Sequence, residues 1–409
     1  MKNPMRSIVW CLVALAAIGW SGEAAGCTSI TVGKEASTDG SVMTSHTCDS
    51  HRTASSIEVV PPAQYAAGVE ITLTKRTDDD SGPMERYGRE VTGSIPQVEK
   101  THGYLNPAYA SMNEHQVAIS ESTFGGREEL VSRVGIIDCE TLTRLMLERA
   151  STARQAITVA GDLLENHGWV DEGEALVVTD PDEAWMFEVV GPGPDEVGAV
   201  WVAQRIPDDH VAVMANCSRI GEIDLDDPDQ FMASENVKSF AAEQGYWDPD
   251  SGEPFRYWQA YDPDGNYSFS CSRRVWRVFD LLAPSLELNA NQGVFPVSVK
   301  PEEQVSPEKI MELLRDTYEG TDYDPVKDLT VTDEDGKTVK SPLANPFMPY
   351  DMNKLLKTNG GWGWRGERPI ARWYAMYVTV TQSRSWLPDP VGGIVWFGYS
   401  NPAMTTYVP

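Results

Sequence analysis

Several motifs common in hydrolases and metalloproteins are missing from this 409-residue sequence. It contains no Cys-x-x-Cys pair, no Gly-x-Ser-x-Gly and no His-Glu-x-x-His, and no histidine lies at zinc-ligand spacing from a cysteine. These absences argue against a structural zinc site, a serine nucleophile elbow and a zincin-type peptidase. We therefore expect neither a metal ion nor a cofactor.

Basic residues are also scarce. Lysine and arginine total 33 against 61 aspartates and glutamates, which gives a net charge of −28. Such a surface repels nucleic acid and anionic lipid, so we exclude both as partners and interpret the charge as a coat that keeps the protein soluble. Beyond the N-terminal region no apolar run reaches 18 residues, so we expect no membrane span.

The N-terminus has the order of regions found in a secretory signal peptide. Lys2 and Arg6 are basic, residues 8–20 are apolar, and residues 21–26 are small or polar before Cys27. We predict that residues 1–26 are a signal peptide or a removed pro-segment, and that the mature protein is secreted or periplasmic. A lipoprotein signal with an acylated cysteine is the alternative, although Ala24 and the polar residues before it argue against lipidation.

Six cysteines are present, and Cys11 leaves with the predicted signal. If Cys27 stays free, Cys48, Cys139, Cys217 and Cys271 remain. Four cysteines allow zero, one or two disulfides and three complete connectivities, which the sequence does not distinguish.

Periodicity predicts strands and helices in successive groups. Alternating or β-branched runs predict strands at 28–34, 41–45, 57–60, 70–73, 116–120, 176–179, 185–190, 199–204 and 211–215. Helical spacing predicts helices at 139–150 (capped by Asp138), 153–166 (capped by Thr152 and stopped at Gly168), 273–282 and 307–318. We expect long loops at 222–270 and 319–368 and further strands after Ile370. This grouping favours an α+β fold over a βαβ alternation.

Cys27 would become the first residue of the mature chain, and this position has a particular chemistry. An N-terminal cysteine carries a thiol with a pKa of about 8.5 and an α-amino group with a pKa of about 8. The amine can act as the local base for the thiol, so no separate histidine is needed. Removal of residues 1–26 would create that base.

Five stretches of the chain resemble the C69 dipeptidases, which are N-terminal nucleophile hydrolases related to penicillin V acylase and bile salt hydrolase. They are residues 27–50 (with Cys27-Thr-Ser-Ile-Thr-Val-Gly and Ser45-His-Thr-Cys-Asp-Ser), 112–122 (Met-Asn-Glu-His-Gln-Val-Ala-Ile-Ser-Glu-Ser), 215–220 (Ala-Asn-Cys-Ser-Arg-Ile), 272–277 (Ser-Arg-Arg-Val-Trp-Arg) and 381–389 (Thr-Gln-Ser-Arg through Leu-Pro-Asp). The resemblance spans residues 27–409 and implies a four-layer αββα fold with additional C-terminal segments. Such relatives usually continue past a segment like Tyr407-Val408-Pro409, so a chain truncated at its C-terminus is one interpretation.

The resemblance also implies roles for individual residues. Cys27 would be the nucleophile, Asp49 would hold its amine or thiol, and Asn216 would donate to the oxyanion. Arg273 would help to keep the thiol ionised, although Arg274 and Arg277 are close in register. His46 and Glu121, which lie in the first and second of these stretches, would bind substrate.

Ordinary structural roles remain open for several of these residues. Asp49 and Asn216 are also typical of turns, Arg273 of a helix surface, and His46 of a hydrogen-bonded structural position. Asn216-Cys217-Ser218 spells a glycosylation sequon, and a glycan there would be incompatible with an oxyanion role.

Three functions follow from these observations. The first is a secreted cysteine dipeptidase that acts on short peptides through an acyl-enzyme. The second is an amidase or acylase with the same nucleophile; His46 stands where acylase relatives carry arginine, which argues against it. The third is a non-enzymatic acidic lipoprotein. We expect a short peptide as the partner and a homo-oligomer, although no sequence feature fixes the oligomeric state.

Overall fold

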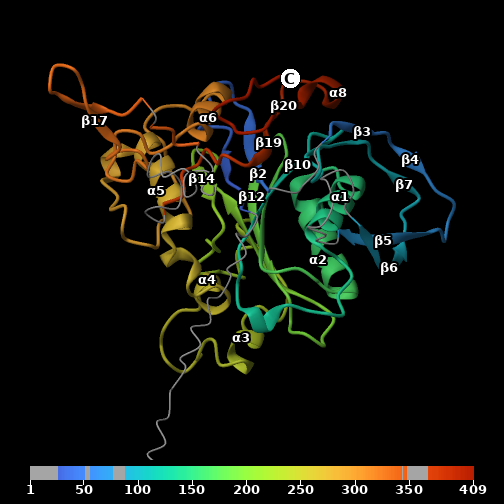
Figure 1. The fold of residues 1–409 in the computed structure, drawn as a ribbon. Helices are drawn as coiled ribbons and strands as arrows, with labels where there is room; N and C mark the ends of the chain where they lie inside the picture. The colour runs from blue at the N-terminus through green and yellow to red at the C-terminus, as the bar shows by residue number, and fades with distance from the viewer. Residues whose placement is uncertain (1–25, 51–55, 77–87, 343, 348–366) are drawn as a thin grey trace, which may run out of the picture.

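The computed structural model describes residues 26–50, 56–76, 88–342, 344–347 and 367–409 (Figure 1). The predicted signal peptide, apart from Gly26, and residues 348–366 of the second predicted loop lie outside the described residues. Within the described residues, no helix is long and apolar enough to cross a membrane.

One antiparallel sheet contains the start of the predicted mature chain. Its strand order is β16-β14-β1-β2-β19-β20. The strands are β1 (Ser29–Val32), β2 (Val42–Asp49), β14 (Val211–Met214), β16 (Ser298–Val299), β19 (Ala375–Ser383) and β20 (Ile394–Tyr399). The predicted hairpin after Cys27 is confirmed, but β2 is longer than the predicted strand 41–45. It reaches Asp49 because β19 pairs along its whole length.

A second antiparallel sheet faces the first and has the order β15-β13-β12-β11-β10-β9-β8-β3. Its strands are β3 (Glu58–Val60), β8 (Tyr104–Asn106), β9 (Met112–Asn113), β10 (Ala118–Thr123), β11 (Glu174–Thr179), β12 (Ala184–Val190), β13 (Val200–Ile206) and β15 (Phe231–Ala233). Gln116, predicted in a strand, has φ 62° and lies in the turn before β10. Apolar side chains of the two sheets, such as Val42, Val177 and Met214, share one core.

Helices cover the outer faces of both sheets. α1 (Cys139–Arg149) and α2 (Ala153–His167) pack on the second sheet, where Leu145 and Ile157 join its buried residues. The predicted N-caps are confirmed, because Asp138 and Thr152 each accept a hydrogen bond from the backbone N–H three residues later. α2 ends at Gly168, as predicted.

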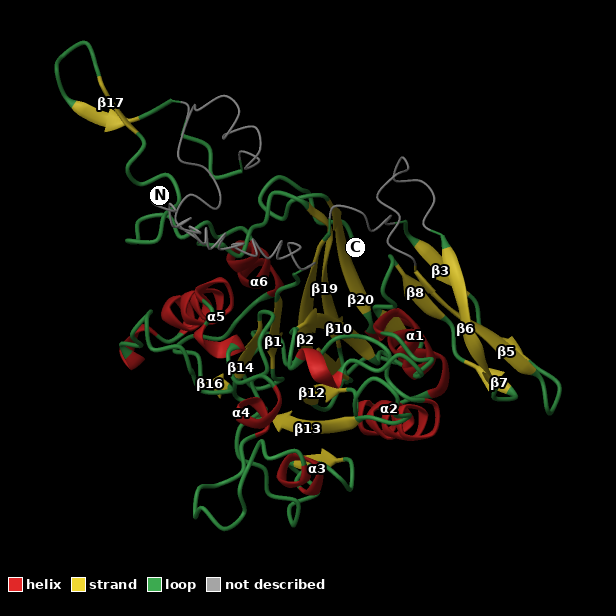
Figure 2. Cartoon of the chain, turned by 60° about the horizontal axis from the view of Figure 1, so that its bottom comes forward, coloured by secondary structure: helices red, strands yellow, loops and turns green. Residues whose placement is uncertain are grey.

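α5 (Phe269–Leu282) and α6 (Pro307–Leu314) pack on the first sheet. Figure 2 shows these two helices and α1 with α2 on opposite sides of the strands. α5 begins four residues before its predicted start. α6 ends before its predicted end at Tyr318, which has φ 64° and therefore cannot continue a right-handed helix. The layers are thus helix, sheet, sheet, helix, and the predicted α+β class is compatible with this arrangement.

The remaining elements of the described residues are strand pairs outside the two large sheets, short helices and 3₁₀ turns. They are the paired strands β4 (Ala63–Gln64) with β7 (Lys100–Thr101), β5 (Glu70–Arg76) with β6 (Arg89–Pro96) and β17 (Thr330–Thr332) with β18 (Thr338–Lys340), the helices α3 (Ser239–Glu243), α4 (Tyr257–Tyr261) and α8 (Asp389–Gly392), and the 3₁₀ turns η1 (Glu128–Leu130), η2 (Gly265–Tyr267) and η3 (Pro284–Leu286). The predicted loops at 222–270 and 319–368 therefore contain short helices and strands.

Candidate active site

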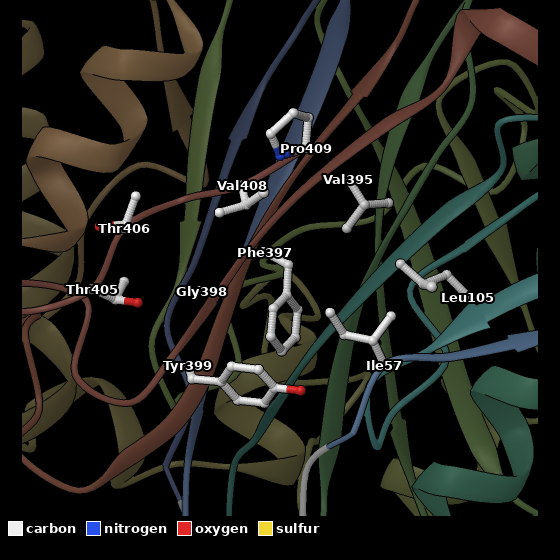
Figure 3. Close-up of a pocket in the computed structure, with 10 residues that line it drawn as sticks. All are labelled: Ile57, Leu105, Val395, Phe397, Gly398, Tyr399, Thr405, Thr406, Val408 and Pro409. Atoms are coloured by element: carbon white, nitrogen blue, oxygen red, sulfur yellow. The ribbon is translucent and has the colours of Figure 1, made fainter.

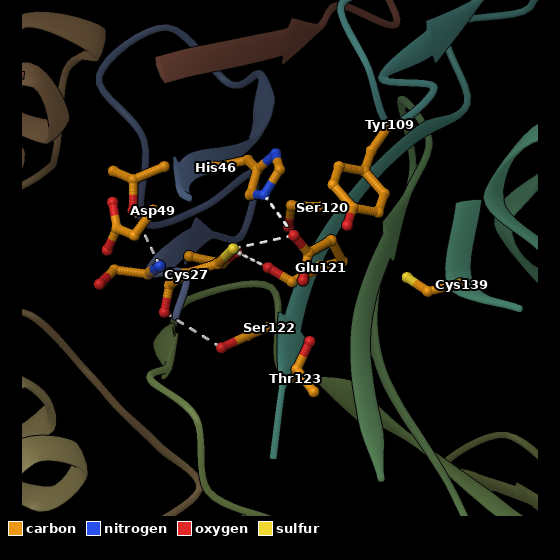
Figure 4. Close-up of polar contacts among 12 residues, drawn as sticks. Cys27, His46, Asp49, Tyr109, Ser120, Glu121, Ser122, Thr123 and Cys139 are labelled. Carbon is orange, nitrogen blue, oxygen red and sulfur yellow. Dashed lines mark hydrogen bonds and ion pairs between the residues drawn. The ribbon is translucent and has the colours of Figure 1, made fainter. Parts of the chain in front are cut away.

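Cys27 lies two residues before β1 and is fixed at the junction of the two sheets. Its side chain is buried, and its Sγ donates to Oε1 of Glu121 on β10 at 2.8 Å (Figure 4). Its carbonyl oxygen accepts from Ser122 Oγ at 3.2 Å and from Arg274 Nη1 at 2.9 Å. Both the main chain and the side chain of Cys27 are therefore held by buried partners.

Glu121 and His46 form a buried pair beside the thiol. His46 Nε2, on β2, lies 2.9 Å from the same Glu121 Oε1, and the His46 ring packs edge-on against Tyr109 and Tyr377. Burial raises the pKa of Glu121, but the hydrogen bond and charge of His46, with the hydrogen bonds from Cys27 and the Thr123 backbone, together lower it below its usual value. The structure therefore places an ionised carboxylate against Cys27. Glu121 Oε2 is buried and has no hydrogen-bond partner among the described residues.

The thiol is not activated in this state. Burial, followed by the negative charge of Glu121, raises the pKa of the Cys27 thiol well above its usual value. Gly26 is still attached here, so Cys27 carries a peptide nitrogen and not an α-amine. Removal of Gly26 would place an ammonium or amine on the same residue as the sulfur, and a neighbouring positive charge lowers a thiol pKa.

Asp49 closes the opposite side of the site, at the end of β2. Its carboxylate is fully buried and accepts a hydrogen bond from Arg368 Nη2. Burial raises the pKa of Asp49, although the positive charges of Arg368 and Arg274 lower it in part. The sequence predicted that Asp49 holds the amine or thiol of Cys27. In the structure the carboxylate of Asp49 binds Arg368, while its backbone carbonyl accepts from Gly26 N at 3.1 Å.

Asn216 follows β14 in the left-handed conformation, with φ 60°, which asparagine tolerates better than most residues. Its Nδ2 donates to Thr123 O at 2.6 Å, and its Oδ1 accepts from Arg274 at 2.8 Å and Arg368 at 2.7 Å. Two cations thus orient the amide. The Nδ2 atom is engaged inside the fold, so a glycan on this sequon does not fit the structure.

Arg273 does not occupy its predicted place near the nucleophile. It pairs with Glu367 at 3.0 Å, donates to Ala290 O and stacks 3.5 Å from the centre of the Tyr323 ring. Arg274 faces Cys27 instead. Consecutive residues of an α-helix point about 100° apart, so a register error of one residue moves a side chain to another face.

Arg274 joins the segments of the site. Its Nη1 donates to Cys27 O and to Thr28 Oγ1 at 2.8 Å, and its Nη2 donates to Ala215 O and Asn216 Oδ1, both at 2.8 Å. The sequence singled out this arginine only as a neighbour in register.

Sequence reasoning missed Arg368 altogether. Its Nη2 donates to Gly26 O at 2.5 Å, in addition to its contacts with Asp49 and Asn216. A buried cation thus touches the residue that precedes the nucleophile. The available signal was a pair of arginines, Arg368 and Arg372, which flank apolar residues just before β19. Arg368 is the last residue of the predicted loop 319–368, and Arg372 follows that loop.

The described residues contain groups that could hold a metal ion, and one of them is this site. The ligand atoms of Cys27, His46 and Glu121 lie within 4.8 Å of one another. Cys27 Sγ and His46 Nε2 both point at Oε1 of Glu121. Hydrogen bonds among the three side chains explain this arrangement without a metal ion. The expectation that no metal is needed stays a prediction.

A cavity of about 470 Å³ lies elsewhere, along β20 (Figure 3). It is lined mainly by apolar side chains, and β19 separates β20 from β2 in the sheet. None of the predicted site residues lines it. The buried polar cluster around Cys27 is therefore the better candidate for chemistry.

The chain belongs to peptidase family C69, whose family model matches residues 26–409. The resemblance that the sequence motifs indicated is thereby confirmed, and the protein is a hydrolase of the peptidase class. It is 26% identical over 395 residues to a probable dipeptidase of Salmonella dublin, covering 95% of this chain and 81% of that protein. It is also 27% identical to a probable dipeptidase of Latilactobacillus sakei (95% and 74% covered) and 24% identical to probable dipeptidase A of Streptococcus pyogenes serotype M3 (94% and 75% covered).

Proposed function

We propose that this protein is a secreted dipeptidase of the cysteine type, with Cys27 as an N-terminal nucleophile after removal of residues 1–26. The observation that carries the proposal is the position of Cys27: its thiol is held against Glu121 and its carbonyl against Arg274, where two facing sheets meet. The helix–sheet–sheet–helix layers support an N-terminal nucleophile hydrolase fold.

The chemistry follows from the two groups on Cys27. Its α-amine accepts the thiol proton as Sγ attacks the carbonyl carbon of the substrate. The amine then returns the proton to the leaving amino group as the peptide bond breaks, which leaves a thioester on Cys27. A water molecule, deprotonated by the same amine, hydrolyses the thioester and restores the thiol.

In this mechanism Asn216 and Arg368 would stabilise the oxyanion. The amide nitrogen of Asn216 donates one of its two hydrogens to Thr123 O, which leaves the second for a substrate oxygen. Arg368 binds the carbonyl of Gly26, so its guanidinium already accommodates a carbonyl oxygen beside Cys27. An oxyanion donor contributes about 2.7–4 kcal/mol to the transition state.

Glu121 and His46 suit the free amino group of a dipeptide. Glu121 carries a buried negative charge with one unpartnered oxygen, and a substrate ammonium is a suitable partner for it. An N-acylated substrate has no such charge. This arrangement favours the dipeptidase over the acylase alternative, which keeps the same nucleophile.

Two measurements test the proposal. Intact-mass analysis of the active, exported protein should show a chain that begins at Cys27; active protein that begins elsewhere would refute it. Cys27→Ala should abolish dipeptide hydrolysis, whereas Cys139→Ser, a buried cysteine on α1, serves as the matched control that stays active.

Substrate and anchoring are tested separately. Free dipeptides should be hydrolysed faster than the same dipeptides with an acetylated N-terminus, and the reverse order would favour the acylase. Incorporation of labelled fatty acid at Cys27 would favour the lipoprotein, because acylation blocks both reactive groups. The homo-oligomer stays a prediction that light scattering can measure.

A further inference from the structure

Two buried cysteines from distant parts of the chain lie beside each other next to the candidate active site. Cys217 follows Asn216 after β14, and Cys271 lies in the first turn of α5. Cys271 Sγ donates to the carbonyl oxygen of Asn216 at 2.9 Å, which is the carbonyl bonded to the nitrogen of Cys217. Both side chains are buried, and each of the two thiols shifts the pKa of the other.

The backbone on both sides of this contact is held in place. Ser218 O accepts from Asn266 Nδ2 at 2.8 Å, and Ser218 N donates to Asp262 Oδ2 at 2.9 Å. Arg274, one turn after Cys271 on α5, donates to Ala215 O. Hydrogen bonds thus fix residues 215–218 against residues 262–274 before and after the cysteine pair.

We propose that Cys217 and Cys271 form a disulfide bond when the protein folds in an oxidising compartment. Of the pairings that the sequence left open, this one joins two buried cysteines, and the Sγ of Cys271 already lies 2.9 Å from the carbonyl oxygen that precedes Cys217. Cys139 instead lies with Glu121 and Glu174, and Cys48 packs in the cluster with Tyr377 and Phe397. The proposal does not depend on the peptidase activity.

The reaction is an ordinary thiol–disulfide exchange. The Cys271 thiolate attacks an external disulfide, such as oxidised glutathione or a protein disulfide oxidant, and forms a mixed disulfide as one external thiol leaves. The sulfur of Cys217 then displaces the second external thiol, which takes up the proton of the Cys217 thiol as it leaves. The two cysteines lose two protons and two electrons, and the external disulfide gains them. The hydrogen bond from Cys217 and the charge of Arg274, against the effect of burial, lower the pKa of Cys271 to about 5, which supplies the attacking thiolate.

The bond would connect two parts of the candidate active site. Asn216 precedes Cys217, and Arg274 lies on the same helix as Cys271, so the disulfide would fix the segment that carries the oxyanion donor to the helix that holds Cys27. Because it closes a long loop, it would also stabilise the fold through the entropy of the unfolded chain.

Peptide mapping of the full-length protein tests the proposal. The protein is expressed with export to an oxidising compartment, or refolded in a buffer of reduced and oxidised glutathione, then unfolded with iodoacetamide and digested without reductant. We expect one peptide pair joined through Cys217 and Cys271, with alkylation at Cys48 and Cys139. Alkylation of both Cys217 and Cys271, or a link from either to another cysteine, would overturn the proposal.

Thermal unfolding gives a second readout. Reductant should lower Tm by about 5 °C, the shift that a loop of this length predicts in a chain of this size. The double variant C217S/C271S should have a low Tm that reductant does not change, whereas C48S/C139S should keep the response to reductant. If either variant fails to fold, the peptide map of the unmodified chain still tests the proposal. A Tm of the unmodified protein that reductant does not change would count against the disulfide.

Discussion

Replacement of Arg274 by lysine tests which of two adjacent arginines holds the nucleophile. Arg274 donates five hydrogen bonds: to Ser270 O at 2.7 Å, Cys27 O at 2.9 Å and Thr28 Oγ1, Ala215 O and Asn216 Oδ1 at 2.8 Å each. A lysine ammonium offers three donors from a single point, so at least two of these five hydrogen bonds are lost. Each lost bond to a charged donor costs about 1.5 kcal/mol. If this total of about 3 kcal/mol is lost entirely from the stabilisation of the transition state, kcat/KM decreases roughly 100-fold.

Arg273→Lys is the matched control, since Arg273 is equally buried but contacts Glu367 and Tyr323. We expect it to reduce stability while kcat/KM of the folded enzyme changes by less than about threefold. Both variants are assayed with a free dipeptide, after circular dichroism has established the folded fraction of each. Equal losses of activity in the two variants, or full activity in Arg274→Lys, would refute the assignment of Arg274.

Two further perturbations address buried carboxylates. Burial raises the pKa of Glu188 from 4.5 to about 7, although the hydrogen bond from Ser218 lowers it. The folded state therefore binds this proton more tightly than the unfolded chain does. The free energy of unfolding should fall by up to about 3 kcal/mol as pH rises from about 4.5 to 7. Urea unfolding across this range should show a flatter profile for Glu188→Gln, and an unchanged slope contradicts the reasoning. In a chain that still carries residue 26, Glu121→Gln removes a negative charge that raises the pKa of the Cys27 thiol, so iodoacetamide should alkylate Cys27 at lower pH than in the parent chain. In the processed enzyme the same variant should raise KM for free dipeptides, and an unchanged KM argues against amine binding by Glu121.

Local signals in the sequence predicted much of the fold. The β-branched run after Cys27 predicted the hairpin, and Asp138, Thr152 and Gly168 predicted where α1 and α2 begin or end. These predictions succeeded because capping and strand alternation are decided by residues near in sequence. β6 was missed, because its residues 89–96 alternate poorly and their pairing with β5 supplies the structure.

The residues of the site that lie in the first two motifs were predictable from the sequence, whereas the arginines of the site were predicted less well. Cys27, His46 and Glu121 come from two different sheets and meet at Glu121 Oε1. They were predicted as site residues because the family resemblance named all three. Arg274 was displaced by one position, and Arg368 was missed, because only the tertiary fold brings it to Asp49. No local pattern encodes a contact between residues so far apart in the chain.

Gly26 has a consequence for the protein before it is processed. A β-carbon at residue 26 would lie 2.6 Å from Arg368 Nη1, and Arg368 cannot withdraw without releasing Asp49 and Asn216. In the proposed mechanism, Gly26 occupies the position where the acyl part of a peptide substrate would bind, so before cleavage it would act as a covalently attached competitor. Under the proposed processing, a single cleavage would generate the catalytic amine and vacate the binding site together, so the uncleaved chain would be its own zymogen.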